Sequence, residues 1–283
     1  LFMMQLIADS GATKCEWCYI NNGKHTIVLT QGISPYFLSV SEITAILQKE
    51  LVQHLPENEF IGQIHFYGTG LTNQQNVAVM QQVLCTVFPQ AQLFIENDLL
   101  AAARSLCGRQ PGIACILGTG ANSCYYDGEK IIKNSPGLGY ILGDEGSGAY
   151  MGKKVVQYYL YETFDEQLHH AFNDSFKTDK ATILQKVYKE PLANRYLAKF
   201  AYFLAENRGH YMIENIIEDS LNEFFFIHLC KYQQSWLLPI HFTGSIAFGF
   251  KDVLTDLCHS YEFEMGTVTQ KPMNGLISYH TTL

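Results

Sequence analysis

A short apolar run that ends in a turn of small residues and continues as a hairpin occurs twice in this sequence. The first copy covers Gln5 to Thr30, with its turn at Asp9 to Lys14, and the second covers Ile113 to Lys133, with its turn at Gly118 to Gly120. Apolar strands joined by Asn-Gly and Asp-Gly turns are typical of hairpins. The duplication therefore predicts two similar halves that face one cleft.

Strand and helix patterns alternate after each copy. After the first copy we expect two strands, at 63–67 and 93–95, and three helices, which begin near the Ser39–Glu42 capping box, at Asn73 and at Leu99. After the second copy we expect helices at 148–162, 179–188, 194–207, 211–232, 247–259 and within 270–280, and strands at 237–243 and 261–264. Strands that alternate with helices are typical of an α/β fold.

The chain is long enough to form two domains. Its 283 residues are 47% hydrophobic and 16% charged, which supplies enough apolar surface for two cores. We place an N-terminal domain at residues 1–108 and a C-terminal domain at 109–269. The last helix, within 270–283, is expected to pack on the N-terminal domain.

Composition excludes several classes of partner. The net charge of -8, without any basic run, gives no electrostatic footprint for nucleic acid or for an anionic membrane. No apolar stretch is long enough to span a bilayer, and no secretory signal is recognised, so we expect a cytoplasmic protein. The eight cysteines are scattered through apolar segments, which favours reduced, buried thiols.

Three strand ends carry glycine turns that suit anions. The small residues of 9–14 and 118–120 let main-chain N–H groups approach a phosphate closely, and Thr13 adds a hydroxyl. Asp9 is suited to hold a hydrated metal ion. A third turn, Thr243 to Ser245, follows another apolar strand.

Acidic residues at two places in the chain are candidate site residues. Asp98 follows a predicted strand and precedes a helix, so it is either a helix N-cap or a general base at the carboxyl end of a strand, and the two roles are not exclusive. Asp144 and Glu145 lie between glycines just ahead of a predicted helix. Acidic groups at such a sharp bend indicate part of a site rather than a solvated face.

Five motifs in order resemble one known family. They are DSGATK at 9–14, NDLLAAA at 97–103, ILGTGANS at 116–123, PGLGYILGDEGSGAYMG at 136–152 and FTGSIAFGF at 242–250. Together they resemble the N-acetylglucosamine kinase group of the BadF/BadG/BcrA/BcrD ATPase family, within the actin-like, sugar-kinase and heat-shock ATPase superfamily. The resemblance implies two ribonuclease H-like domains, with mixed sheets flanked by helices, around an interdomain cleft.

The resemblance also implies roles for residues in ATP binding. ATP and Mg²⁺ would be the cofactors, with Asp9 near the metal ion through water. The residues implied to contact ATP come from the three glycine turns and are Gly11, Ala12, Thr13, Lys14, Gly118, Thr119, Gly120, Gly244 and Ser245.

For the sugar, the resemblance implies that Asp98 deprotonates the 6-hydroxyl of an amino sugar. The residues implied to bind the sugar are Ser34, Asn97, Thr119, Gly137, Gly139 and Asp144. N-acetylglucosamine is the expected substrate. The family usually has asparagine where this chain has Ser34, which leaves a near relative such as glucosamine or N-acetylmuramic acid as the alternative. Relatives also suggest a homodimer.

Two other functions compete with the sugar kinase. An activator ATPase of acyl-CoA dehydratases or reductases would hold an iron–sulfur cluster between subunits, and Cys107, Cys115 and Cys124 are near the second glycine turn. Cys115, however, lies inside an apolar strand and Cys124 in a hairpin strand. The third reading is a non-catalytic sugar-binding protein that has kept the fold, for which Ser34 is the only hint.

Overall fold

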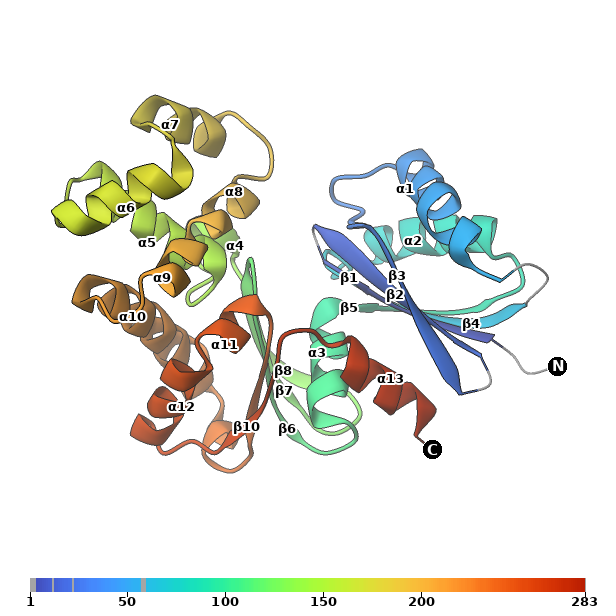
Figure 1. Ribbon diagram of the computed structural model, residues 1–283. Helices are drawn as coiled ribbons and strands as arrows, with labels where there is room; N and C mark the ends of the chain where they lie inside the picture. The colour runs from blue at the N-terminus through green and yellow to red at the C-terminus, as the bar shows by residue number, and fades with distance from the viewer. Residues whose placement is uncertain (1–3, 12, 22, 57–59, 283) are drawn as a thin grey trace. The chain divides into compact units, whose positions relative to one another are not determined.

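The structure is a computed structural model that describes residues 4–11, 13–21, 23–56 and 60–282 (Figure 1). The chain forms two compact units. Unit 1 consists of Leu1–Arg109 and Pro272–Leu283, and unit 2 consists of Gln110–Lys271. Each unit is described by itself below.

Unit 1 is built on a mixed five-stranded sheet. Its strand order is β3-β2-β1-β4-β5, in which β1, β2 and β3 are antiparallel while β4 and β5 run parallel to β1. The strands are β1 (Met4–Ser10), β2 (Lys14–Asn21), β3 (Lys24–Gln31), β4 (Ile61–Gly68) and β5 (Gln92–Asn97).

Helices of unit 1 cover the sheet. Apolar residues of α1, its continuation η1 and α2 form one core with side chains of the sheet such as Trp17 and Phe66. Helix α3 packs against α13 and contacts β1, β4 and β5. The helices are α1 (Val40–Ile46), η1 (Leu47–Leu51), η2 (Val52–His54), α2 (Gln74–Val87), α3 (Asp98–Cys107) and α13 (Met273–Thr281). Ser39 and Glu42 form the expected capping box at α1.

Helix α13 approaches α3 closely in unit 1. A Cβ on Gly275 would lie 2.2 Å from the Ser105 carbonyl oxygen, so only glycine permits this contact. The Ser105 hydroxyl donates to the Pro272 carbonyl at 2.7 Å. At the other end of α13, Nε2 of His280 lies 2.9 Å from the hydroxyl of Tyr67 on β4. The C-terminal segment is therefore bonded into unit 1 at both ends.

Unit 2 repeats the topology of the first sheet. Its strand order, β8-β7-β6-β9-β10, has the same antiparallel hairpins followed by two parallel strands. The strands are β6 (Gly112–Leu117), β7 (Ala121–Tyr126), β8 (Ile131–Ser135), β9 (Ile240–Thr243) and β10 (Met265–Thr269). The predicted α/β fold with two mixed sheets flanked by helices is confirmed.

Helices of unit 2 supply a large apolar core rich in phenylalanine. They are α4 (Gly139–Leu142), α5 (Gly148–Leu160), α6 (Glu166–Phe176), α7 (Lys180–Tyr188), α8 (Ala193–Lys199), α9 (Ala201–Glu206), α10 (Tyr211–Ile227), η3 (Leu229–Lys231), η4 (Gln233–Trp236), α11 (Ser245–Gly249) and α12 (Lys251–Ser260). Helix α6 was not predicted. The strand predicted at 261–264 is wrong, because the strand that pairs with β9 begins at Met265.

Two further expectations concern the whole chain. In the described residues no disulfide joins any of the eight cysteines, and six of them are buried, with Cys85 exposed and Cys230 partly exposed. Within the described ranges, no helix has the length and apolar character needed to cross a membrane.

Candidate functional site

Ser10 gathers three segments at the carboxyl edge of the unit 1 sheet. Its hydroxyl donates to the Ile33 carbonyl at 2.9 Å and accepts from the Ile33 N–H at 3.0 Å. The Ser10 carbonyl accepts from the Thr69 N–H at 2.9 Å. The first glycine turn, the loop that contains Ser34 and the turn after β4 are therefore held together, where parallel sheets bind ligands.

Asp98 is the first residue of α3, and Asn97 is the helix N-cap. The Asn97 side-chain oxygen accepts from the Leu100 N–H at 2.9 Å. The interpretation of Asp98 as the cap is therefore wrong. Burial raises the pKa of Asp98, although hydrogen bonds from the Leu99 N–H and the Thr69 side chain act in the opposite direction. A carboxylate with a raised pKa is the better proton acceptor.

Ser34 is buried with an unpaired hydroxyl. Its side chain is 3% exposed, and its Oγ has no hydrogen-bond partner among the described residues. A Cβ on Gly70 would lie 3.2 Å from that Oγ, so the hydroxyl lies against the turn after β4. A buried polar group without a partner costs free energy, which is expected where a ligand completes the hydrogen bond.

The first glycine turn joins β1 to β2. Gly11 donates its N–H to the Lys14 carbonyl at 3.0 Å, and the Thr13 carbonyl accepts from Gly32 at 3.1 Å. Gly11, Thr13 and Lys14 are exposed, and Ala12 lies outside the described residues.

Asp9 is partly buried at the end of β1, just before this turn. No cluster of three or more metal-binding side chains occurs in the described part of the chain. One carboxylate nevertheless fits Mg²⁺, which binds proteins through one or two carboxylates and takes its other oxygens from water and phosphate.

The second glycine turn joins β6 to β7 and is hydrogen-bonded to the first residues of α5. The N–H groups of Gly148 and Ala149 donate to the carbonyls of Gly118 and Thr119 at 2.8 and 3.0 Å. Within the turn, the Gly118 N–H donates to the Gly120 carbonyl at 3.0 Å. In this conformation the Gly118 N–H is therefore already used within the turn and is not available to a phosphate.

The turn after β9 lies directly against the second glycine turn. Gly244 has a φ of +121°, and a Cβ there would lie 2.2 Å from the carbonyl oxygen of Leu117. The Gly244 N–H also donates to the Thr269 carbonyl at 3.0 Å. The segments expected to bind phosphate and adenosine, Gly118 to Gly120 and Gly244 to Ser245, are thus brought together in unit 2.

Asp144 also lies against the second glycine turn. A Cβ on Gly120 would lie 3.0 Å from Oδ2 of Asp144, and one on Gly137 would lie 3.8 Å from its Oδ1. The carboxylate accepts hydrogen bonds from the backbone of Ala121 and Gly139. Burial raises the pKa of Asp144 despite these bonds. The predicted sugar residues of unit 2 therefore do come together.

Two site features were missed by the sequence interpretation. Thr69 bonds to Asp98, and His228 bonds to Glu145 through Nε2 and Oε2 at 2.9 Å. Neither residue lies in the five motifs, and both contacts join segments far apart in sequence, so no local signal marks them.

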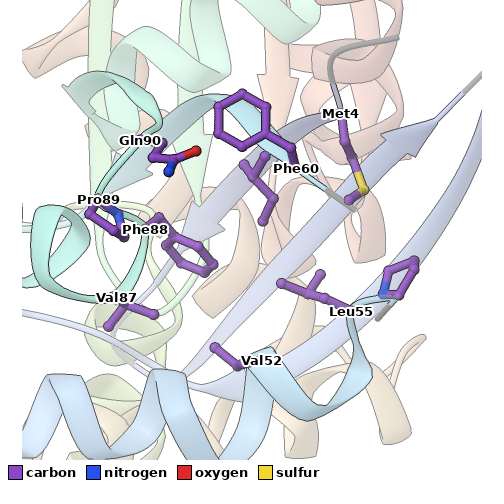
Figure 2. Close-up of a pocket in the computed structure, with 10 residues that line it drawn as sticks. Met4, Val52, Leu55, Phe60, Val87, Phe88, Pro89 and Gln90 are labelled. Atoms are coloured by element: carbon purple, nitrogen blue, oxygen red, sulfur yellow. The ribbon is translucent and has the colours of Figure 1, made fainter. Parts of the chain in front are cut away.

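An apolar pocket of about 380 Å³ lies elsewhere in unit 1 (Figure 2). Met4 and Ile61, the first residues of β1 and β4, line it together with Val52, Phe60 and Phe88. It therefore lies at the opposite edge of the sheet from Ser10 and is not the candidate site.

The cysteines give no support to an iron–sulfur centre. Cys115 and Cys124 are fully buried in β6 and β7. Burial raises the pKa of Cys107 to about 12, which disfavours the thiolate that a metal requires.

No protein-family model and no curated protein matches the chain, but solved structures do. The chain is 37% identical to a protein from Porphyromonas gingivalis described as a putative N-acetylglucosamine kinase, with a TM-score of 0.92 over 97% of this chain and 98% of that one. A putative N-acetylglucosamine kinase from Chromobacterium violaceum is 17% identical, with a TM-score of 0.74 over 98% of each chain. A ROK family glucokinase from Streptomyces griseus, solved with glucose and AMPPNP, is 14% identical, with a TM-score of 0.54 over 98% of this chain and 97% of that one. The last two show a shared fold.

Proposed function

This chain belongs to the same family as the putative N-acetylglucosamine kinase of Porphyromonas gingivalis, and we propose on that premise that it is an ATP-dependent sugar kinase. The reaction would transfer the γ-phosphoryl group to the 6-hydroxyl of an amino sugar. The observation that carries the proposal is the 37% identity over 97% of the chain. The five ordered motifs further support assignment to the BadF/BadG/BcrA/BcrD ATPase family.

In this proposal Asp98 takes the proton from the attacking hydroxyl. Its raised pKa brings it closer to the working range of a general base, and its bond to Thr69 fixes the direction of the carboxylate. Asn97 supports this role indirectly. Its hydrogen bond to the Leu100 N–H caps α3, and Asp98 is the first residue of that helix.

The glycine turns would hold the phosphates of ATP. Phosphoryl transfer needs little covalent chemistry from a protein, which must align the groups and offset negative charge. Gly11, Thr13 and Lys14 of unit 1 and Thr119 and Gly120 of unit 2 are the proposed contacts. Mg²⁺ near Asp9 would supply further positive charge when bound.

Gly244 and Ser245 would hold the adenosine. Their proposed role is supported by the contact of Gly244 with the carbonyl of Leu117, which keeps this turn beside the second phosphate turn.

Asp144 and Ser34 would bind sugar hydroxyl or amide groups. A partly buried carboxylate accepts strong hydrogen bonds from hydroxyls, and Asp144 is already fixed by Ala121 and Gly139. Ser34 offers a buried hydroxyl with an unused bond. N-acetylglucosamine is the first candidate substrate, with glucosamine and N-acetylmuramic acid next.

A coupled ADP-release assay over a panel of amino sugars tests the proposal. We expect ATP- and Mg²⁺-dependent turnover with at least one amino sugar, and none with its 6-deoxy analogue, which lacks the acceptor. Turnover with the 6-deoxy sugar would contradict 6-phosphorylation. The absence of turnover with every sugar would reject the kinase and favour a non-catalytic sugar-binding protein.

A further inference from the structure

Glu145 and Asp144 are neighbours with different partners in unit 2. The carboxylate of Asp144 lies against Gly120, whereas Oε2 of Glu145 lies 2.9 Å from Nε2 of His228. The side chains of His228 and Glu145 are only 7% and 14% exposed. Glu145 therefore has a buried partner, His228, and neither residue is among the proposed sugar contacts.

The imidazole of His228 also contacts the sheet of unit 2 through its second ring nitrogen. Its Nδ1 lies 2.8 Å from the Ser135 hydroxyl at the end of β8. The Ser135 N–H donates to the Tyr232 hydroxyl at 2.6 Å, and that hydroxyl donates to the Ser123 carbonyl on β7 at 3.0 Å. The tautomer that carries its proton on Nε2 satisfies both neighbours, with Nε2–H donating to Glu145 and Nδ1 accepting from Ser135.

The turn that carries both carboxylates packs on α10, next to His228. Asp144 and Gly146 have φ values of +59° and +74°. A Cβ on Gly146 would lie 2.9 Å from Cβ of Phe224, so the turn packs on α10. The centroid of the Phe224 ring lies 5.1 Å from the centroid of the His228 imidazole.

The turn that carries Asp144 and Glu145 leads into α5, whose first residues are hydrogen-bonded to the second glycine turn. Ser147 donates its N–H to the Asp144 carbonyl at 3.0 Å, and its hydroxyl caps α5 by accepting from Tyr150. Gly148 then donates to Gly118 at 2.8 Å. The position of Asp144 is thus coupled to the Glu145 bond on one side and to α5 on the other.

We propose that His228 is a positioning residue for sugar phosphorylation, acting through Glu145 to hold Asp144 in its binding geometry. This inference rests on the proposed function. Without the imidazole, the buried carboxylate of Glu145 would lose its partner and would turn toward water. The backbone at Asp144 would shift with it, and a displacement of about 1 Å at a binding group can cost about a hundredfold in rate.

Kinetics of two His228 variants test this role. His228→Phe removes both hydrogen bonds, and we expect kcat/KM for the sugar to fall about 10- to 100-fold while KM for ATP stays within about twofold. His228→Gln keeps an N–H donor for Glu145 and should recover activity to within about fivefold of the parent.

A matched control is available on the same helix. His210, at the other end of α10, bonds to Asp165 through Nε2 and Oδ2 at 2.8 Å. His210→Phe therefore removes a similar pair far along α10 from Asp144, and we expect sugar kcat/KM within about twofold of the parent. An equal loss in the two phenylalanine variants would overturn the positioning role.

The remaining outcomes separate the two proposals. Wild-type turnover together with an unchanged sugar kcat/KM in His228→Phe would overturn the positioning role alone. No sugar-dependent turnover by the wild type would overturn both. If His228→Phe does not fold, Glu145→Met carries the test, because it keeps the length of the side chain and removes the acceptor of the imidazole N–H. It should lower sugar kcat/KM at least about tenfold, and unchanged kinetics would overturn the role.

Discussion

Gly244→Ala offers a sharp test of how the two turns of unit 2 meet. The backbone of Gly244 has φ +121° and ψ 166°, a conformation that is essentially restricted to glycine. A Cβ there would lie 2.2 Å from the Leu117 oxygen, whereas ordinary contacts begin at 3.4 Å. The turns must therefore separate by 3.4 - 2.2 = 1.2 Å.

The expected cost follows from two contributions. The strained backbone costs about 1–3 kcal/mol, and overpacking in a well-packed region costs about 1–3 kcal/mol. We therefore expect Gly244→Ala to lower the free energy of unfolding of unit 2 by about 2–6 kcal/mol. KM for ATP should also rise, because the proposed adenosine and phosphate segments would no longer touch.

The chain has a convenient optical probe for this measurement. It holds two tryptophans, of which Trp17 lies in unit 1 and Trp236 in unit 2. In a Trp17→Phe background, urea unfolding followed by fluorescence reports unit 2. A probe for one unit is needed because a two-domain chain need not unfold in a single transition.

Gly249→Ala is the matched control for Gly244→Ala. Gly249 is the last residue of α11, is exposed, and has no atom within 4 Å of the position of an added Cβ. Alanine there should leave stability unchanged or raise it by up to about 1 kcal/mol. A Gly244→Ala protein within about 0.5 kcal/mol of its parent would refute the described contact.

Three further predictions concern unit 1. Asp98→Asn should retain ATP binding, measured by calorimetry, and lose at least about a hundredfold in sugar turnover, because the positioned base is gone; unchanged turnover would remove Asp98 from the mechanism. Ser34→Ala should leave unit 1 as stable or up to about 3 kcal/mol more stable in urea, because an unpaired buried hydroxyl is removed, and should raise the sugar KM. Ser10→Ala, which removes a paired hydroxyl, should instead lower stability by about 1 kcal/mol, and the same sign for both serines would contradict this reasoning. Burial lowers the pKa of His65 to about 4 and that of His280 to about 3. Folded unit 1 thus binds fewer protons than the unfolded chain, so its stability should be full above about pH 6.5 and fall as the pH drops toward 4 and 3. Urea midpoints of a Trp236→Phe protein at several pH values measure this loss, and a His280→Gln variant with the same pH dependence would argue against it.

Local signals in the sequence predicted the framework of the fold. Glycine turns after apolar strands mark the ends of β1, β6 and β9 because both features lie within a few residues of each other. The duplicated hairpins predicted the repeated sheet for the same reason.

Errors in the predicted elements arose where two neighbouring choices are locally equivalent. Asn97 and Asp98 are equally good caps, and only the structure shows that Asn97 is used. The run Tyr261 to Glu264 alternates like a strand, yet pairing with β9 selects Met265 to Thr269. Helix α6 begins after the N-cap Asp165 and buries only Leu168 and Phe172. Two buried residues make too short a periodic pattern to be recognised in the sequence.

The sequence predicted the glycine turns of the candidate site and acidic candidates such as Asp98 and Asp144, but not the side chains that contact those acids. Thr69 meets Asp98 because β4 and β5 are neighbours in the sheet. His228 meets Glu145 because α10 ends beside the turn before α5, a consequence of tertiary packing over long sequence separation. Contacts of this kind have no counterpart in residue spacing.

The closure of unit 1 by α13 bears on how the chain is synthesised. Unit 2 is continuous in sequence, whereas unit 1 is formed by one segment before unit 2 and one segment after it. As the chain leaves the ribosome, unit 2 can fold as soon as Lys271 has emerged, while the earlier-made sheet of unit 1 still lacks the helix that fits Gly275 against Ser105. Domains generally fold in the order of synthesis. Here the synthesis of unit 1 begins before that of unit 2 but is completed after it. Until α13 has been made, the surface of α3 that α13 covers stays exposed.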